Sequence, residues 1–133
     1  MDRKRYVQVG LGGRSSMFYD AIVQKYADHC EIRALCDVNH GRMRHAQERI
    51  HHSGGPDVAM YAPEQFDRMI EEQTPDAVIV TTKDCMHDEY ICRAMEAGCD
   101  VITEKPMTTD EHKCRRIIET QRRTGRQCRA NWL

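Results

Sequence analysis

The chain has 133 residues, enough for one domain of ordinary size with its own apolar core. Its net charge of −1 gives no sign of nucleic-acid binding, and no apolar run approaches the roughly 18 residues of a membrane span. Seven cysteines without a Cys-x-x-Cys pair, and no signal-peptide pattern, favour a reduced cytoplasmic protein without disulfide framework, zinc site or membrane association.

Strand-like and helix-like segments alternate along the whole chain. Short apolar runs predict strands at residues 6–10, 31–36, 58–61, 77–82, 100–103 and 127–132. Between them, apolar residues recur at helical spacing, as at Cys114, Ile117 and Ile118. Asn39 is a good N-cap for a helix that runs to about His52.

This alternation predicts the α/β class. Residues 77–80 are apolar at consecutive positions, which is typical of a strand covered on both faces of a parallel sheet. We therefore expect one Rossmann domain over residues 1–133: a doubly wound parallel sheet of about six strands with helices on both faces. Ligands of such sheets bind at the carboxyl ends of the strands, here between the first and fourth strands.

The first strand leads into a glycine-rich loop of the dinucleotide-binding type, Gly10-Leu11-Gly12-Gly13-Arg14-Ser15. Gly10 permits the tight turn, and Gly12, which has no Cβ atom, allows a pyrophosphate to approach the backbone closely. Gly13 is predicted to bind the cofactor as part of the same loop. Ser15, in the third small position, lets the helix pack near the strand. Arg14 either contacts the phosphates or points to solvent.

An acidic residue follows at the expected distance. Asp37 ends the second strand, where its carboxylate could accept hydrogen bonds from the adenosine ribose and disfavour a 2′-phosphate. Asn39 and Arg42 follow closely, and Arg42 could pair with a 2′-phosphate. The predicted cofactor is therefore NAD, with NADP also allowed.

Two polar loops are predicted at the far side of the same crevice. The fourth strand ends in Thr81, Thr82 and Lys83, candidates for hydrogen bonds to cofactor ribose or phosphate. His87 either caps the next helix or faces the nicotinamide ribose. The fifth strand ends in Glu104 and Lys105.

The segment Val-Ile-Thr-Glu-Lys-Pro-Met-Thr at residues 101–108, after Asp-Ala-Val-Ile-Val-Thr-Thr at residues 76–82, resembles the Gfo/Idh/MocA family. The resemblance runs from the glycine loop to Trp132, and Glu-Lys-Pro is its most distinctive part. It implies hydride transfer between a nicotinamide cofactor and a sugar, cyclitol or related polyol. It also implies that Lys105 assists catalysis at the substrate oxygen, with Glu104 supporting the loop and the cofactor ribose.

The sequence departs from the family pattern in length. Family members continue into a second domain that supplies most of the substrate pocket, and none of it is present here. Two hypotheses follow: the cofactor-binding part of a dehydrogenase, or a non-catalytic redox-sensing or interaction module. A Rossmann-like domain for a methyl donor or coenzyme A is a third option, and self-association through exposed apolar surface is a further expectation.

Two other groups of residues are interpreted without a functional role. His45, His51 and His52 lie near one helix end, but no cysteine or carboxylate set completes a metal site, so no metal is expected. The basic residues after position 112 are interpreted as a solvated helix face.

Overall fold

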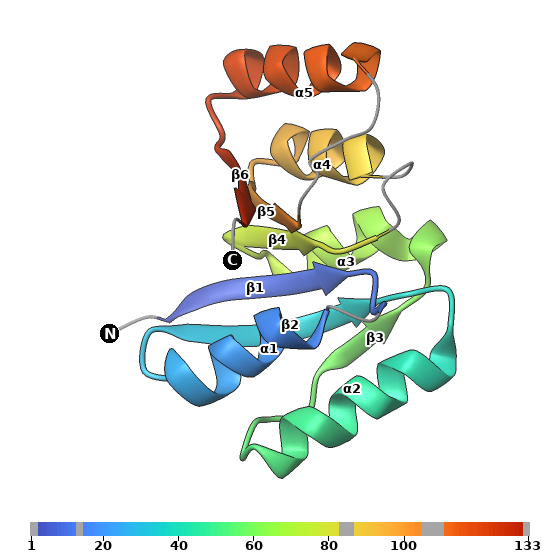
Figure 1. Ribbon diagram of the computed structural model, residues 1–133, viewed down its shortest axis with the longest axis vertical. Coiled ribbons are helices and arrows are strands. Elements are labelled where there is room, and N and C mark those ends of the chain that lie inside the picture. The colour runs from blue at the N-terminus through green and yellow to red at the C-terminus, as the bar shows by residue number, and fades with distance from the viewer. Residues whose placement is uncertain (1–2, 13–14, 83–86, 105–110, 132–133) are drawn as a thin grey trace.

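The computed structural model in Figure 1 describes residues 3–12, 15–82, 87–104 and 111–131, without the side chains of residues 87, 104, 130 and 131. The strands are β1 (Lys4–Val9), β2 (Cys30–Cys36), β3 (Ala59–Tyr61), β4 (Ala77–Val80), β5 (Asp100–Glu104) and β6 (Cys128–Asn131). The helices are α1 (Ser16–Asp20), α2 (His40–His52), α3 (Phe66–Gln73), α4 (His87–Glu96) and α5 (Glu111–Thr124). A π-helical turn, Ala21–Lys25, extends α1, and a 3-10 turn, Pro63–Gln65, precedes α3.

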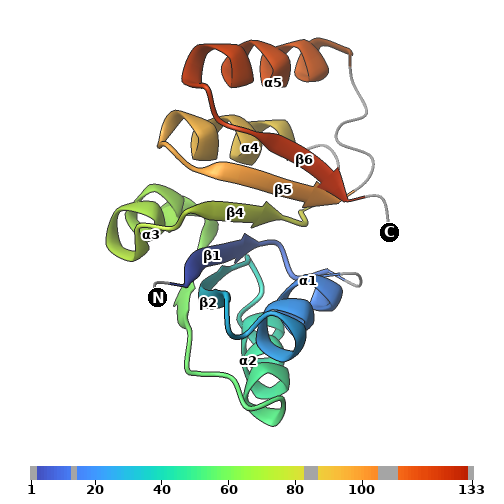
Figure 2. The same cartoon turned by 90° about the vertical axis from the view of Figure 1, so that its left-hand side faces the viewer.

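The strands form one parallel sheet in the order β3-β2-β1-β4-β5-β6. Figure 2 shows β4, β5 and β6 side by side, with their arrowheads toward the same edge. The order reverses between β1 and β4: from β1 the chain continues to β2 on one side, and from β4 it continues to β5 on the other side. The predicted doubly wound fold and its switch point are confirmed.

Two apolar clusters cover the two faces of the sheet. One combines Val7, Val9 and Val78 with side chains of α3, α4 and α5. The other combines Leu35 and Ile79 with side chains of α1, its π-helical extension and α2. The alternate residues of β1 and β4 thus face opposite layers, which explains why β4 is apolar at every position.

Most local signals act as the sequence predicts. The Asn39 side chain accepts a hydrogen bond from the backbone N–H of Arg42 at 3.1 Å, and the helix that it caps ends at His52. The helical spacing at Cys114, Ile117 and Ile118 lies within α5, where Ile117 is buried and Ile118 is 47% exposed. Within the described part of the chain, no helix is long and apolar enough to cross a membrane.

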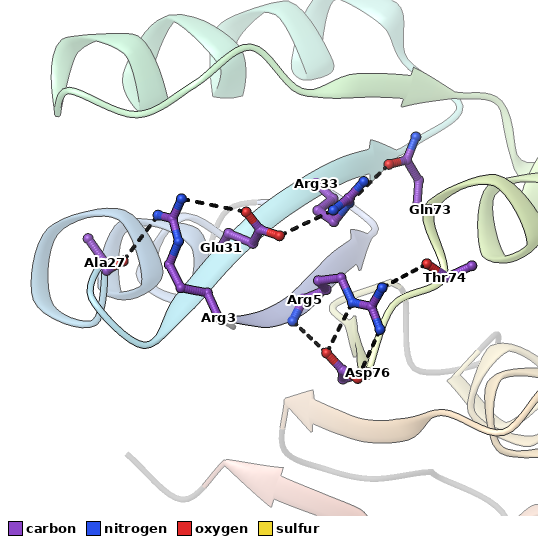
Figure 3. A network of polar contacts seen from close by, with 8 residues as sticks. All are labelled: Arg3, Arg5, Ala27, Glu31, Arg33, Gln73, Thr74 and Asp76. Atoms are coloured by element: carbon purple, nitrogen blue, oxygen red, sulfur yellow. Dashed lines mark hydrogen bonds and ion pairs between the residues drawn. The ribbon is translucent and has the colours of Figure 1, made fainter. Parts of the chain in front are cut away.

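The amino ends of the strands carry a network of charged side chains (Figure 3). Asp76 accepts hydrogen bonds from the backbone N–H of Arg5 at 2.8 Å and from its Nε at 3.4 Å. Glu31 pairs with Arg33 at 3.2 Å and with Arg3 at 3.7 Å. These residues line a cleft of about 810 Å³, but its arginines already have protein partners. We therefore assign this network to joining the strands, not to ligand binding.

Asp76→Asn should make the protein less stable at neutral pH. Hydrogen bonds from Arg5 lower the pKa of Asp76 below its ordinary value, and the bond from the Arg5 backbone N–H has the largest effect. A lowered folded-state pKa stabilises the fold above the unfolded pKa of about 4, and this contribution is lost as the pH falls through the folded value. Because the pair is about two-fifths exposed, the expected loss near pH 7 is only about 0.5–1 kcal/mol. Urea unfolding at about pH 7 and pH 3 should show the difference between variant and wild type shrinking in acid; a constant difference would contradict this account.

Candidate functional site

A small cleft opens at the carboxyl ends of β1, β2 and β4, at the switch point of the sheet. Its volume is about 220 Å³. The residues that line it are Val9, Gly10, Gly12, Cys36, Asp37, Val38, Pro63, Thr81, Thr82 and Tyr90. Five of these were predicted from the sequence as cofactor-binding residues: Gly10, Gly12, Asp37, Thr81 and Thr82. The fold therefore brings Gly10 and Thr81, which are 71 residues apart in the sequence, into one site.

Gly10 makes the turn out of β1 and lies directly against β4. Its φ is +87°, in the left-handed region, where side chains other than glycine are strained. A Cβ atom at this position would lie 2.6 Å from the backbone nitrogen of Thr82 and 2.7 Å from the carbonyl of Thr81. Glycine is thus required at position 10 by both conformation and space.

Gly12 is different, because its surroundings are open. A Cβ atom there would meet nothing within 4 Å, and the residue is exposed. It lines both the small cleft and a second cleft that extends toward α2. The fold itself therefore leaves room above Gly12, as a group that approaches the backbone from solvent would need.

Ser15 ends the described part of the loop and is buried. Its hydroxyl donates to the carbonyl of Gly12 at 2.7 Å, and its backbone N–H donates to the same oxygen at 3.1 Å. These two bonds join Ser15 to Gly12 just before α1. A small side chain at position 15 is consistent with the predicted close packing of helix and strand.

The carboxylate of Asp37 binds the loop from the neighbouring strand. One oxygen accepts the backbone N–H of Leu11 at 2.8 Å, and the other accepts that of Asn39 at 3.0 Å. Asp37 is only 6% exposed, although it lies at the end of β2 beside the cleft. Each carboxylate oxygen can accept a second hydrogen bond, so this anchoring role leaves acceptor capacity for a ligand hydroxyl.

Thr81 closes the site from the side of β4. Its backbone N–H donates to the carbonyl of Val9 at 2.8 Å, and its hydroxyl donates to the carbonyl of Gly10. The hydroxyl also accepts the side-chain amide of Gln8 at 3.1 Å. The sequence-based prediction placed Thr81 at the site, but the structure uses its hydroxyl to join two loops.

Asn39 and Arg42 lie beside the cleft, at the start of α2. Both line the second cleft, of about 480 Å³, together with His45 and Arg49. The side-chain oxygen of Asn39 caps α2, while Arg42 is exposed. Arg49 is an ion-pair partner of Asp20 at 2.5 Å. Arg42 therefore provides positive charge in the second cleft, at the start of α2.

Apart from Asp37, the small cleft is lined by uncharged residues. Burial raises the pKa of the Cys36 thiol to about 12, and the Asp37 charge adds to this shift, so the thiol stays neutral. Burial also raises the pKa of Tyr90 above its ordinary value. With Val38 and Pro63, these side chains give the cleft an apolar lining suited to a flat ring.

Several predicted site residues cannot be placed. Gly13, Arg14, Lys83 and Lys105 lie outside the described residues. The backbones of His87 and Glu104 begin α4 and end β5, but their side chains are not described. In the described part of the chain, no group of three His, Cys, Asp or Glu side chains is arranged as metal ligands.

Sequence reasoning missed six residues of this region, five of the ten that line the small cleft and one beneath the loop. Val38, Pro63 and Tyr90 line the cleft but have no distinctive pattern in the sequence. Gln8 is completely buried beneath the glycine loop. Its signal was available: it is a polar residue inside an otherwise apolar strand end, Tyr-Val-Gln-Val.

Comparisons with known proteins agree with this geometry. A family model, GFO_IDH_MocA, described as an oxidoreductase family with an NAD-binding Rossmann fold, matches residues 4–132. The Bacillus subtilis protein YteT, named as an oxidoreductase, is 32% identical over 122 residues, covering 89% of this chain and 27% of its own length. Inositol 2-dehydrogenase of Agrobacterium fabrum is 28% identical over 123 residues, covering 91% and 35%.

Two further similar proteins have a name or a bound ligand that refers to a sugar. Alpha-N-acetylgalactosaminidase of Bacteroides fragilis is 28% identical over 125 residues, covering 93% of this chain and 29% of its own length. A WlbA dehydrogenase from Chromobacterium violaceum, solved with NADH and UDP-GlcNAcA, superposes with a TM-score of 0.82 at 27% identity, covering 98% and 35%.

The present chain thus spans about a third of the length of these proteins, or less. The match to the family model nevertheless includes every described element, from β1 to β6. The chain belongs to the Gfo/Idh/MocA oxidoreductase family and comprises its NAD-binding Rossmann domain.

Proposed function

We propose that this domain binds NAD(H), and less well NADP(H), with the diphosphate over Gly12 and the adenosine ribose beside Asp37. The observation that carries the proposal is the glycine loop at the switch point, open at Gly12 and bound by the Asp37 carboxylate. The residues present fit the cofactor: there is room above Gly12, spare acceptor capacity on Asp37, and an apolar lining that includes Val38 and Pro63, against which the adenine ring would lie.

We further propose that the whole protein oxidises or reduces a sugar, cyclitol or related polyol. The nicotinamide ring, when bound, would take up or supply the hydride. Lys105 would hold the reacting substrate oxygen and polarise it, because a cation stabilises charge that develops there. The inositol 2-dehydrogenase relative and the UDP-GlcNAcA complex of the WlbA dehydrogenase support this substrate class.

A titration of the purified chain with NADH and with NADPH tests the binding proposal. Quenching or enhancement of nicotinamide fluorescence reports the dissociation constants. We expect saturable binding of both, with NADH bound more tightly because the Asp37 carboxylate repels a 2′-phosphate. If neither cofactor binds to a folded chain, the proposed function is wrong.

Asp37→Ala should weaken NADH binding by about 1–3 kcal/mol, the usual effect of losing charged hydrogen bonds. It should also lower the free energy of unfolding by about 1–3 kcal/mol, since the backbone N–H groups of Leu11 and Asn39 lose their acceptor. Titration and urea unfolding measure the two effects separately.

A cofactor without the adenosine 2′-hydroxyl separates the ribose contact from the anchoring of the loop. If Asp37 binds that hydroxyl, the deoxy analogue should bind to wild type more weakly than NADH does. Asp37→Ala should then discriminate much less between the two. Equal discrimination by wild type and variant would remove Asp37 from the ribose site and leave it only the anchoring role.

A second activity is supported by the similarity to alpha-N-acetylgalactosaminidase, which equals the inositol dehydrogenase in identity. In this case the whole protein would cleave a glycosidic bond. Assays of the full-length protein distinguish the two: a dehydrogenase accumulates NADH from NAD and a polyol, whereas a glycosidase releases free sugar from a glycoside without net formation of NADH.

A further inference from the structure

Gln8 is the one residue of β1 whose polar side chain is wholly buried, at 0% exposure. Its neighbours in the strand, Val7 and Val9, face the layer of α3, α4 and α5. Gln8 faces the opposite layer, beneath the start of α1. An amide at this depth is costly to bury unless it makes hydrogen bonds.

The side-chain nitrogen of Gln8 makes two such bonds, and both reach the cofactor loops. It donates to the carbonyl of Ser15 at 2.9 Å and to the hydroxyl of Thr81 at 3.1 Å. The Thr81 hydroxyl in turn donates to the carbonyl of Gly10. One buried chain of hydrogen bonds therefore links both ends of the glycine loop to the end of β4.

The side-chain oxygen of Gln8 contributes nothing comparable to stability. Among the described residues it has no hydrogen-bond partner, although it is buried. Replacing the amide by an apolar group would remove this unsatisfied acceptor. The replacement would also leave no new buried group without a hydrogen bond. The carbonyl of Ser15 still accepts the backbone N–H of Phe18 at 3.2 Å, and the hydroxyl of Thr81 still donates to the carbonyl of Gly10.

We infer that Gln8 is a positioning residue for the cofactor: it fixes the position of the glycine loop relative to Thr81 at the end of β4. This inference rests on the proposed dinucleotide binding. Gln8 does not line either cleft beside the loop, so it acts through Ser15, Thr81 and Gly10. A loop already held in place loses less conformational freedom when the diphosphate binds, which tightens binding.

Gln8→Met tests this, because methionine has a similar length but no amide. With two buried hydrogen bonds to the loops lost, the dissociation constant for NADH should rise about tenfold or more. The midpoint of thermal unfolding without cofactor should stay within about 3 °C of wild type. Gln8→Leu, which also lacks the amide, should show the same pattern.

Thr120→Val is the matched control. Thr120 is also a buried polar residue, and its hydroxyl donates to the carbonyl of Arg116 at 2.7 Å, but it lies in α5 on the other face of the sheet. Its loss should lower the unfolding midpoint without changing the NADH dissociation constant. An unchanged dissociation constant in Gln8→Met, or loss of its cooperative unfolding, would overturn the positioning role while NADH binding by wild type stands. If wild type itself does not bind NADH, both the proposed function and this inference are wrong.

Discussion

Gly10→Ala is expected to lower the free energy of unfolding by about 3–5 kcal/mol, a large part of the stability of an ordinary domain. Two causes add. The positive φ of +87° strains any residue with a Cβ atom. The new methyl group would also lie 2.6–2.7 Å from backbone atoms of Thr81 and Thr82, which cannot move without breaking the pairing of β1 with β4. Urea unfolding measures the loss.

Gly54→Ala separates the two causes. Gly54 has nearly the same φ, +86°, but a Cβ atom there would meet nothing within 4 Å. This control should therefore lose only the conformational part, about 1–2 kcal/mol. If Gly54→Ala and Gly10→Ala destabilise equally, the close approach to β4 contributes nothing, and the account of Gly10 given above is wrong.

Gly12→Val is expected to have the opposite profile: a fold of nearly unchanged stability that no longer binds the cofactor. The open space around Gly12 accommodates a side chain in the absence of ligand. That same side chain would occupy the position of the diphosphate. We expect the dissociation constant for NADH to rise by at least about 100-fold, roughly 2.7 kcal/mol or more.

Thermal unfolding with and without NADH measures both halves of this prediction. In wild type, NADH at about 100 times its dissociation constant should stabilise the folded state by about 2.7 kcal/mol, and in Gly12→Val this stabilisation should nearly vanish. Gly12→Ala, with one methyl group instead of three carbons, should lie between the two. Retained affinity in a well-folded Gly12→Val would show that no phosphate lies over this loop.

The sequence alone was sufficient for the fold class and for half of the residues that line the candidate cleft. The apolar runs and the helical spacing between them are local features, and together with chain-crossover rules they permit few arrangements other than a doubly wound sheet. The glycine loop and Asp37 were recognised because the pattern follows a strand and precedes a helix. The spacing that predicted the last helix does not show which of its residues are buried: Ile117 is buried and Ile118 is exposed, because spacing identifies a helical stripe but not how widely the neighbouring elements cover it.

Only the tertiary structure determined which groups the side chains of Asp37, Thr81 and Gln8 bind. Asp37 turns its carboxylate to Leu11, and Thr81 and Gln8 meet across a separation of 73 residues. Neither contact is encoded in local spacing, because both depend on β1 lying between β2 and β4 in a particular register. The same pairing explains why Gly10 and Gly12, equal members of one motif in the sequence, are constrained so differently: β4 crowds the first, and solvent borders the second.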